Sequence, residues 1–228
     1  MARPIAAPGT PSMQDTGSVG VTVDGLDAAM RELVELSIVI ATASEPELRA
    51  RMQRVVSAKI DSTWIEELIL QSYIFAGFPR ALNAAREWRR ASGVPAPCSD
   101  DDASADQAGR WRERGEEVCS TVYGAAYNRL RANIRELHPA LDEWMIVDGY
   151  GKVLGRSGLD LRRRELCVVA VCGALAQERQ LHAHLHGALN AGATPAEVQD
   201  TLDIVSKHVD EEIGSRMAHL WNRIQKKQ

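Results

Sequence analysis

The pattern Gly-Leu-Asp, three residues, Arg-Glu-Leu occurs twice in this chain, at residues 25–33 and again at residues 158–166. The two copies are 133 residues apart, and the same offset, without a gap, pairs Glu45 with Glu178 and Trp88 with Trp221. A repeat keeps its register over such a length because a one-residue slip would rotate an apolar stripe out of the core. The sequence therefore predicts two tandem helical units, related by a pseudo-two-fold axis.

Turn signals and composition divide the chain into four parts. Residues 1–22, rich in Pro, Gly, Ser and Thr, predict a disordered tail, and residues 91–110 are typical of a linker. The first repeat then occupies residues 23–90, and residues 111–228 hold a helical extension followed by the second repeat. No segment alternates with the period of a strand, and aromatic residues make up only 5% of the chain, so we expect an all-α fold.

Charge and hydropathy exclude several classes of partner. The net charge of −4 and the even mixture of basic and acidic residues argue against nucleic-acid binding. No apolar run approaches the roughly 20 residues that span a bilayer, and residues 1–22 lack a basic start followed by an apolar stretch. We therefore expect a cytoplasmic protein that binds neither nucleic acid nor membrane.

Glu165 and His184 are the first candidate pair for chemistry. Glu165 leads directly into the apolar run of residues 166–175, where a carboxylate is costly unless it has a partner. His184 shares a helical face with Leu181 and Leu185 and so points inward. Two inward titratable groups on adjacent helices form either an acid/base pair or a structural hydrogen bond.

Two further clusters carry charge or metal-ligand chemistry. His182 and His186 lie one helical turn apart with Glu178 one turn earlier, but their polar neighbours favour a solvated face over a metal site. We therefore predict no metal and no cofactor. Arg162, Arg163 and Arg164 follow Asp160 in the first turn of a helix and are either solvated or held by an anion.

The second copy of the pattern continues into a longer motif. Residues 161–166 read Leu-Arg-Arg-Arg-Glu-Leu, an apolar run follows, and then come Glu178, His184 and the segment Gly-Ala-Thr-Pro-Ala-Glu-Val at residues 192–198. The first copy carries a tyrosine, glycine, proline and asparagine segment at residues 73–83. These residues resemble the carboxymuconolactone decarboxylase family, the second copy more closely than the first.

The resemblance implies an all-α alkylhydroperoxidase D-like fold that assembles into trimers or hexamers. One branch of the family uses a glutamate, a CxxC pair and a histidine, whose positions here hold Glu165, Gln177, Gln180 and His184. Both redox cysteines are absent, and the four cysteines of the chain, at positions 98, 119, 167 and 172, form no CxxC. The chain resembles instead the decarboxylase branch, which works without a cofactor.

The resemblance also implies roles for individual residues. In the family's decarboxylation the electrons left by carbon dioxide flow into a conjugated carbonyl, so the enzyme stabilises an enolate and returns a proton. His184 would donate that proton and Glu165 would hold or tune His184. Substrate oxygens would be anchored by Tyr150 or by one of three arginines, Arg162, Arg163 or Arg164. The expected substrate is a small carboxylic acid or lactone.

Two departures from the family pattern leave other functions open. Arg51 stands where the first repeat would carry the equivalent of His184, and residues 206–212 replace the tyrosine, glycine and proline segment in the second repeat. A non-catalytic oligomeric binding or assembly protein that has lost its pocket would account for both departures. A thiol peroxidase-like antioxidant protein is the other alternative, and the absence of a CxxC pair disfavours it.

Overall fold

A computed structural model describes residues 25–226 of the chain, and the tail expected over residues 1–22 lies outside them. No strand occurs between residues 25 and 226, which confirms the all-α prediction. Four helices of the first repeat each begin 133 residues before a helix of the second, and this confirms the tandem repeat. The pairs are α1 (Ala28–Thr42) with α8 (Leu161–Ala174), α2 (Glu45–Ser57) with α9 (Glu178–Asn190), α3 (Ser62–Phe75) with α10 (Pro195–Val205), and α4 (Phe78–Ser92) with α11 (Glu211–Gln225).

The same local signal starts the first helix of both repeats. The Asp27 carboxylate caps α1 by accepting a hydrogen bond from the backbone N–H of Met30, and Asp160 caps α8 by accepting one from Arg163. In the second repeat, Thr194 and Glu197 form a complete capping box at the start of α10. The repeated aspartate therefore has a local physical role, because it fixes where the first helix of each unit begins.

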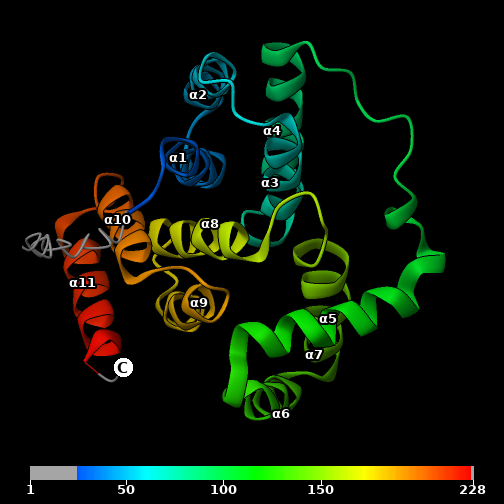
Figure 1. The fold of residues 1–228 in the computed structure, drawn as a ribbon, viewed down its shortest axis with the longest axis vertical. Helices are drawn as coiled ribbons and strands as arrows, with labels where there is room; N and C mark the ends of the chain where they lie inside the picture. Colours follow the sequence, from blue (N-terminus) through cyan, green and yellow to red (C-terminus); the bar gives the residue numbers. More distant parts are fainter. Residues whose placement is uncertain (1–24, 227–228) are drawn as a thin grey trace, which may run out of the picture.

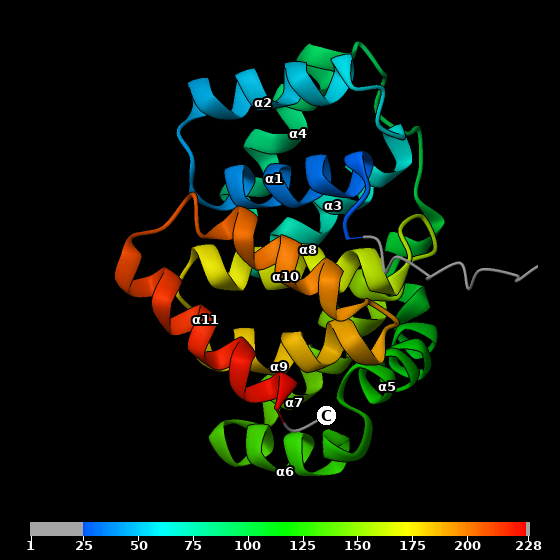
Figure 2. The ribbon, with the colours of Figure 1, turned by 60° about the vertical axis from the view of Figure 1, so that its left-hand side comes forward.

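A helical insertion separates the two repeats. It consists of two short 3₁₀ turns, η1 (Asp101–Ala103) and η2 (Ala105–Gln107), then α5 (Ala108–Tyr123), η3 (Gly124–Ala126), α6 (Tyr127–Leu137), α7 (Pro139–Trp144) and η4 (Met145–Leu154). The long helix α5 packs against η4 and α9. In Figures 1 and 2 the green helices α5, α6 and α7 lie beside α9 and on the far side of the molecule from α2. The insertion therefore covers the second repeat.

The segment η4 is a π-helix, a wide form of helix. Such helices are rare in proteins, but those that occur are often at functional sites. Its contact with α5 depends on two glycines. A Cβ on Gly151 would lie 1.9 Å from the Trp111 carbonyl oxygen, and one on Gly115 would lie 2.0 Å from the Ile146 oxygen. Only glycine at both positions lets the two backbones approach this closely.

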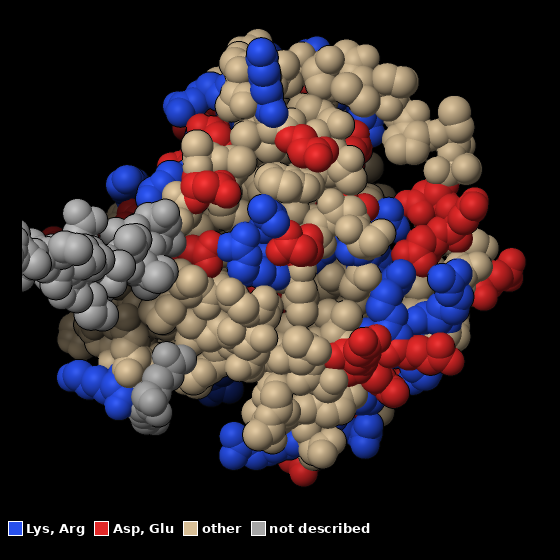
Figure 3. All heavy atoms as spheres, viewed as in Figure 1, with Lys and Arg blue, Asp and Glu red and all other residues tan. Residues whose placement is uncertain are grey.

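The surface carries charges of both signs. On the face shown in Figure 3, basic and acidic side chains lie close to one another, and this face has no continuous basic area. None of the helices between residues 25 and 226 has the length and apolar character needed to cross a bilayer.

A pair of arginine–carboxylate contacts, here called the clasp, joins the two repeats. Arg164 Nη2 lies 2.7 Å from Glu67 Oε2, and at the equivalent positions Arg31 Nη2 lies 2.5 Å from Asp200 Oδ2. Each contact runs from the first helix of one repeat to the third helix of the other. The reciprocal exchange is what a pseudo-two-fold axis between the repeats requires.

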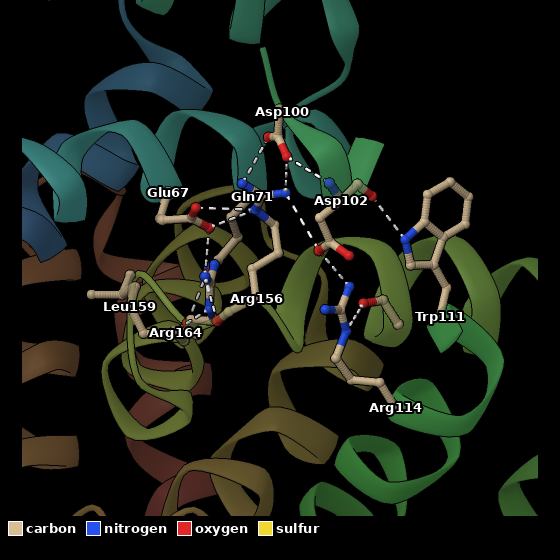
Figure 4. Close-up of polar contacts among 10 residues, drawn as sticks. Glu67, Gln71, Asp100, Asp102, Trp111, Arg114, Arg156, Leu159 and Arg164 are labelled. Carbon is tan, nitrogen blue, oxygen red and sulfur yellow. Dashed lines mark hydrogen bonds and ion pairs between the residues drawn. The ribbon is translucent and has the colours of Figure 1, made fainter. Parts of the chain in front are cut away.

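The repeated sequence pattern encodes the clasp. Arg164 Nε donates to the Leu159 carbonyl at 2.8 Å, as Arg31 Nε does to that of Leu26 at 3.1 Å (the Arg164 contacts are drawn in Figure 4). Glycine precedes each leucine because the acidic side chain of the other repeat occupies the place where a Cβ would lie. A Cβ at position 158 would lie 2.7 Å from Glu67 Cγ, and one at position 25 would lie 2.1 Å from the Asp200 carboxylate.

The two halves of the clasp differ in burial, which predicts unequal contributions to stability. Arg164 is fully buried, so Arg164→Met should lower the free energy of unfolding by about 3 kcal/mol, because the Leu159 carbonyl loses this donor and Glu67 keeps only Arg156. Arg31→Met is the matched control: the Arg31 side chain is 47% exposed, and exposed pairs contribute about 1 kcal/mol or less. Urea unfolding followed by circular dichroism measures both, and equal losses would contradict the prediction.

Candidate functional site

Glu165 on α8 and His184 on α9 meet in the interior of the second repeat. His184 Nδ1 lies 2.8 Å from Glu165 Oε2, and both side chains are buried. Because an ionised carboxylate can only accept, the proton of this hydrogen bond belongs to Nδ1. The Nε2 atom, on the opposite edge of the imidazole, is therefore the nitrogen that remains for a ligand.

One oxygen of the Glu165 carboxylate has no hydrogen-bond partner. Its Oε1 atom is buried and accepts no hydrogen bond. A Cβ at Gly187, three residues after His184, would lie 2.5 Å from Glu165 Oε2, so glycine is required there for the carboxylate to fit. A buried acceptor left unsatisfied costs free energy, and such groups concentrate at functional sites.

His184 forms part of the wall of a cavity of about 840 Å³ between α9 and the insertion. The ring of Phe75, at the end of α3, meets the His184 ring edge to face at 5.7 Å between centroids. The remaining wall is mostly apolar and comes from α5, α6, α7 and η4, with Leu130, Ile134, Leu141, Met145 and Leu154 among its residues. Both the volume and the few convergent polar groups are typical of a small-molecule site.

Two tyrosines, Tyr123 from α5 and Tyr150 from η4, face the same cavity. Their rings lie 6.1 Å apart, and the Tyr123 ring lies 6.4 Å from that of His184. Burial raises the pKa of Tyr123 to about 12 and raises that of Tyr150 well above its usual range. Both hydroxyls therefore stay protonated at neutral pH, and each can donate a hydrogen bond to a ligand.

The rim of the cavity holds two charged residues that the sequence patterns did not single out, Arg179 at the start of α9 and Asp148 on η4. Gln180, at one of the family's CxxC positions, also lines the cavity. Arg179 is exposed and is paired with no carboxylate among the described residues. Arg179 has no counterpart in the first repeat, which carries Pro46 at the equivalent position. That difference between the copies is the signal that could have identified it.

The three arginines expected near the substrate lie elsewhere, and none of them lines the cavity. Arg162 pairs with Glu197 on α10, and Arg164 belongs to the clasp. Arg163 pairs with the capping residue Asp160 and lies over the Trp64 ring at 4.2 Å. The structure brings Glu165, His184 and Tyr150 together but places all three arginines in contacts that hold α8 to its neighbours.

The first repeat holds a different pair at the equivalent place. Arg51 Nη2 lies 2.7 Å from Glu32 Oε2 and 3.1 Å from the Glu32 carbonyl oxygen, and Arg51 is buried. Burial lowers the pKa of Arg51, yet a guanidinium stays protonated in proteins. This pair can therefore hold α2 to α1 but cannot exchange a proton as an imidazole does.

The thiols and the other histidines lie outside this arrangement. Cys119, Cys167 and Cys172 are buried, and burial raises the pKa of each thiol to about 12. The rings of His182 and His186 meet edge to face at 5.0 Å. Among residues 25–226 no three His, Cys, Asp or Glu side chains are arranged to hold a metal ion.

Comparison with known proteins gives two matches. The sequence pattern of the Carboxymuconolactone decarboxylase family matches residues 13–90 and 139–206, one region in each repeat. The chain is also 29% identical over 142 residues to Peroxisomal protein 2 of Schizosaccharomyces pombe, a match that covers 61% of this chain and 66% of that protein. The first region covers α1 to α4 almost to the end of α4, whereas the second runs from α7 through η4, α8, α9 and α10 and ends before α11. The chain therefore belongs to the carboxymuconolactone decarboxylase family, with its alkylhydroperoxidase D-like fold in two tandem copies.

Proposed function

We propose that the protein is a cofactor-independent acid/base enzyme that decarboxylates a small carboxylic acid or lactone, or catalyses a related lyase or isomerase step. The observation that carries the proposal is the 2.8 Å contact between His184 and Glu165 at the wall of the 840 Å³ cavity. A fixed imidazole with one free nitrogen beside a largely apolar cavity is suited to proton transfer. Family membership supports the fold, while the reaction rests on this geometry.

The proposed reaction needs one proton and no oxidant. The bond from carbon to the departing carboxylate breaks, and its electron pair moves into a conjugated carbonyl, giving an enolate and carbon dioxide. Protonated His184 then donates the Nε2 proton to carbon as the carbonyl re-forms, and it regains a proton from solvent. Glu165 stabilises the imidazolium and keeps the Nδ1 proton in place throughout.

Tyr123 and Arg179 have distinct roles in this scheme. The Tyr123 hydroxyl donates to the enolate oxygen, and its high pKa keeps it protonated at neutral pH. Arg179 binds a carboxylate that the substrate retains. A cation on the departing carboxylate would stabilise the ground state more than the transition state and would slow the reaction. The scheme therefore favours a substrate with two acidic groups.

The alternatives receive less support from the site. A thiol peroxidase needs an accessible thiolate beside the histidine, whereas Gln177 and Gln180 stand at the family's CxxC positions and three thiols are buried. A purely assembling protein has no need of a buried glutamate with a free oxygen beside an open cavity. Assembly into trimers or hexamers and a cytoplasmic location remain predictions. The name of the Schizosaccharomyces pombe relative places that protein in the peroxisome.

Removing either member of the pair should abolish turnover while the protein stays folded. We expect His184→Ala and Glu165→Gln to lower kcat by about 10²–10⁴-fold in an assay of carbon dioxide release from conjugated lactone acids and small dicarboxylic acids. His182→Ala is the matched control, since His182 is exposed on the same helix and should leave kcat unchanged. Unchanged turnover in folded His184→Ala would reduce the pair to a structural hydrogen bond.

The burial of the thiols predicts their reactivity. At pH 8 the native protein should titrate a single thiol with a disulfide reagent, that of the exposed Cys98, whereas the unfolded protein should titrate all four. The reason is that a pKa near 12 keeps Cys119, Cys167 and Cys172 as thiols, which are not nucleophilic. A second thiol that reacts rapidly in the native protein would favour the peroxidase alternative.

A further inference from the structure

A second cavity, here called the groove, lies on the other side of Tyr73 from the first. The groove encloses about 400 Å³ between α3, α4, the chain around residues 100–103 and the end of η4. Tyr73 lines both cavities and meets the Phe78 ring edge to face at 5.9 Å. Its volume falls in the range of about 300–1,000 Å³ that is usual for small-molecule sites.

The walls of the groove are apolar and open. Four large side chains on them are unusually exposed for their type: Leu70 at 41%, Tyr73 at 43%, Phe78 at 59% and Leu82 at 43%. Ile69, Ala81, Ala85 and Val153 complete the apolar surface. A contiguous exposed apolar surface of this kind on a folded protein marks a binding site.

Charged residues form one edge of the groove and hold its wall in place. Arg156 lies 2.9 Å from Asp100 and 3.0 Å from Glu67. Figure 4 shows Arg164 and Arg114 on either side of it. These contacts attach the segment that carries Asp100 to the end of η4. The cluster is balanced, because the three arginines 114, 156 and 164 face the three carboxylates 67, 100 and 102.

Lys152 adds one cation that this cluster does not neutralise. The Lys152 side chain lines the groove, and its Nζ lies 4.8 Å from the centre of the Trp111 ring. No carboxylate of residues 25–226 pairs with it. A cation–π contact leaves ammonium hydrogens available to an anion. The groove therefore combines an apolar trough with one unpaired positive charge at its edge.

We propose that the groove binds an aliphatic monocarboxylate, with the alkyl chain along α3 and α4 and the carboxylate at Lys152. The apolar side chains supply the affinity for the chain, and the single excess cation selects one negative charge. This site is separate from the His184 cavity, because Lys152 and Leu82 line only the groove. The occupant that competes with this proposal is a second copy of the protein lying on α3 and α4.

Isothermal titration of the full-length protein with octanoate, and with 1-octanol as an uncharged probe of equal chain length, tests the proposal. The wild type should bind octanoate more tightly than octanol. Lys152→Gln should weaken octanoate binding at least about fivefold and leave octanol binding unchanged. Leu82→Gln should weaken both ligands by about threefold or more, because it removes apolar contact.

Two controls distinguish binding in the groove from binding elsewhere on the protein. Arg86→Gln removes an exposed cation from α4 outside the groove and should change neither affinity, and His184→Ala should bind octanoate as the wild type does. The proposal is overturned if the wild type does not bind octanoate or does not distinguish it from octanol. It is also overturned if His184→Ala abolishes binding, or if Leu82→Gln changes the sedimentation coefficient while octanoate affinity stays the same.

Discussion

The buried end of the clasp, in which Arg164 lies between Glu67 and the Leu159 carbonyl, holds in place α8, the helix that carries Glu165. Arg164 binds the third helix of the first repeat and so fixes α8 along its axis and about it. Glu165 is the next residue, about 100° further round α8, and its carboxylate meets His184 of α9. A rotation of α8 that broke the clasp would also withdraw the Glu165 carboxylate from the imidazole. Stability and site geometry therefore depend on the same helix.

Comparison of the two repeats separates the features that they share from those in which they differ. The frame is shared, since equivalent helices start at the same offset and equivalent arginines form the clasp. The imidazole of His184 is not shared, because Arg51, a permanent cation, stands at the equivalent position of the first repeat. The insertion packs on α9 of the second repeat and supplies Tyr123 and Tyr150 to the cavity there. The chain thus has two similar helical units, and the chemistry we propose is confined to the second.

Local patterns were sufficient to predict the helices and the contact between Glu165 and His184. Both predictions rest on helical periodicity, and the Asp27 and Asp160 caps that the structure shows act over the same short range of one or two turns of chain. The cavity wall could not be predicted from the sequence, because Arg179 and Tyr123 are brought to the same cavity only by the packing of α5, α9 and η4. The arginines at 162–164 show the same limit. Their charge suggested an anion site, but their partners Glu197, Asp160 and Glu67 include two that are distant in sequence.

The central claim is that Glu165 holds His184 with the proton on Nδ1 and Nε2 toward the cavity. A long-range ¹H–¹⁵N spectrum of protein labelled at the histidine ring nitrogens reads this directly, with Glu165→Gln for comparison. The account predicts that neutral His184 carries its proton on Nδ1, in contrast to the Nε2 tautomer that free histidine favours. It also predicts that Glu165→Gln weakens this preference. A neutral His184 protonated on Nε2 in the wild type would contradict the account.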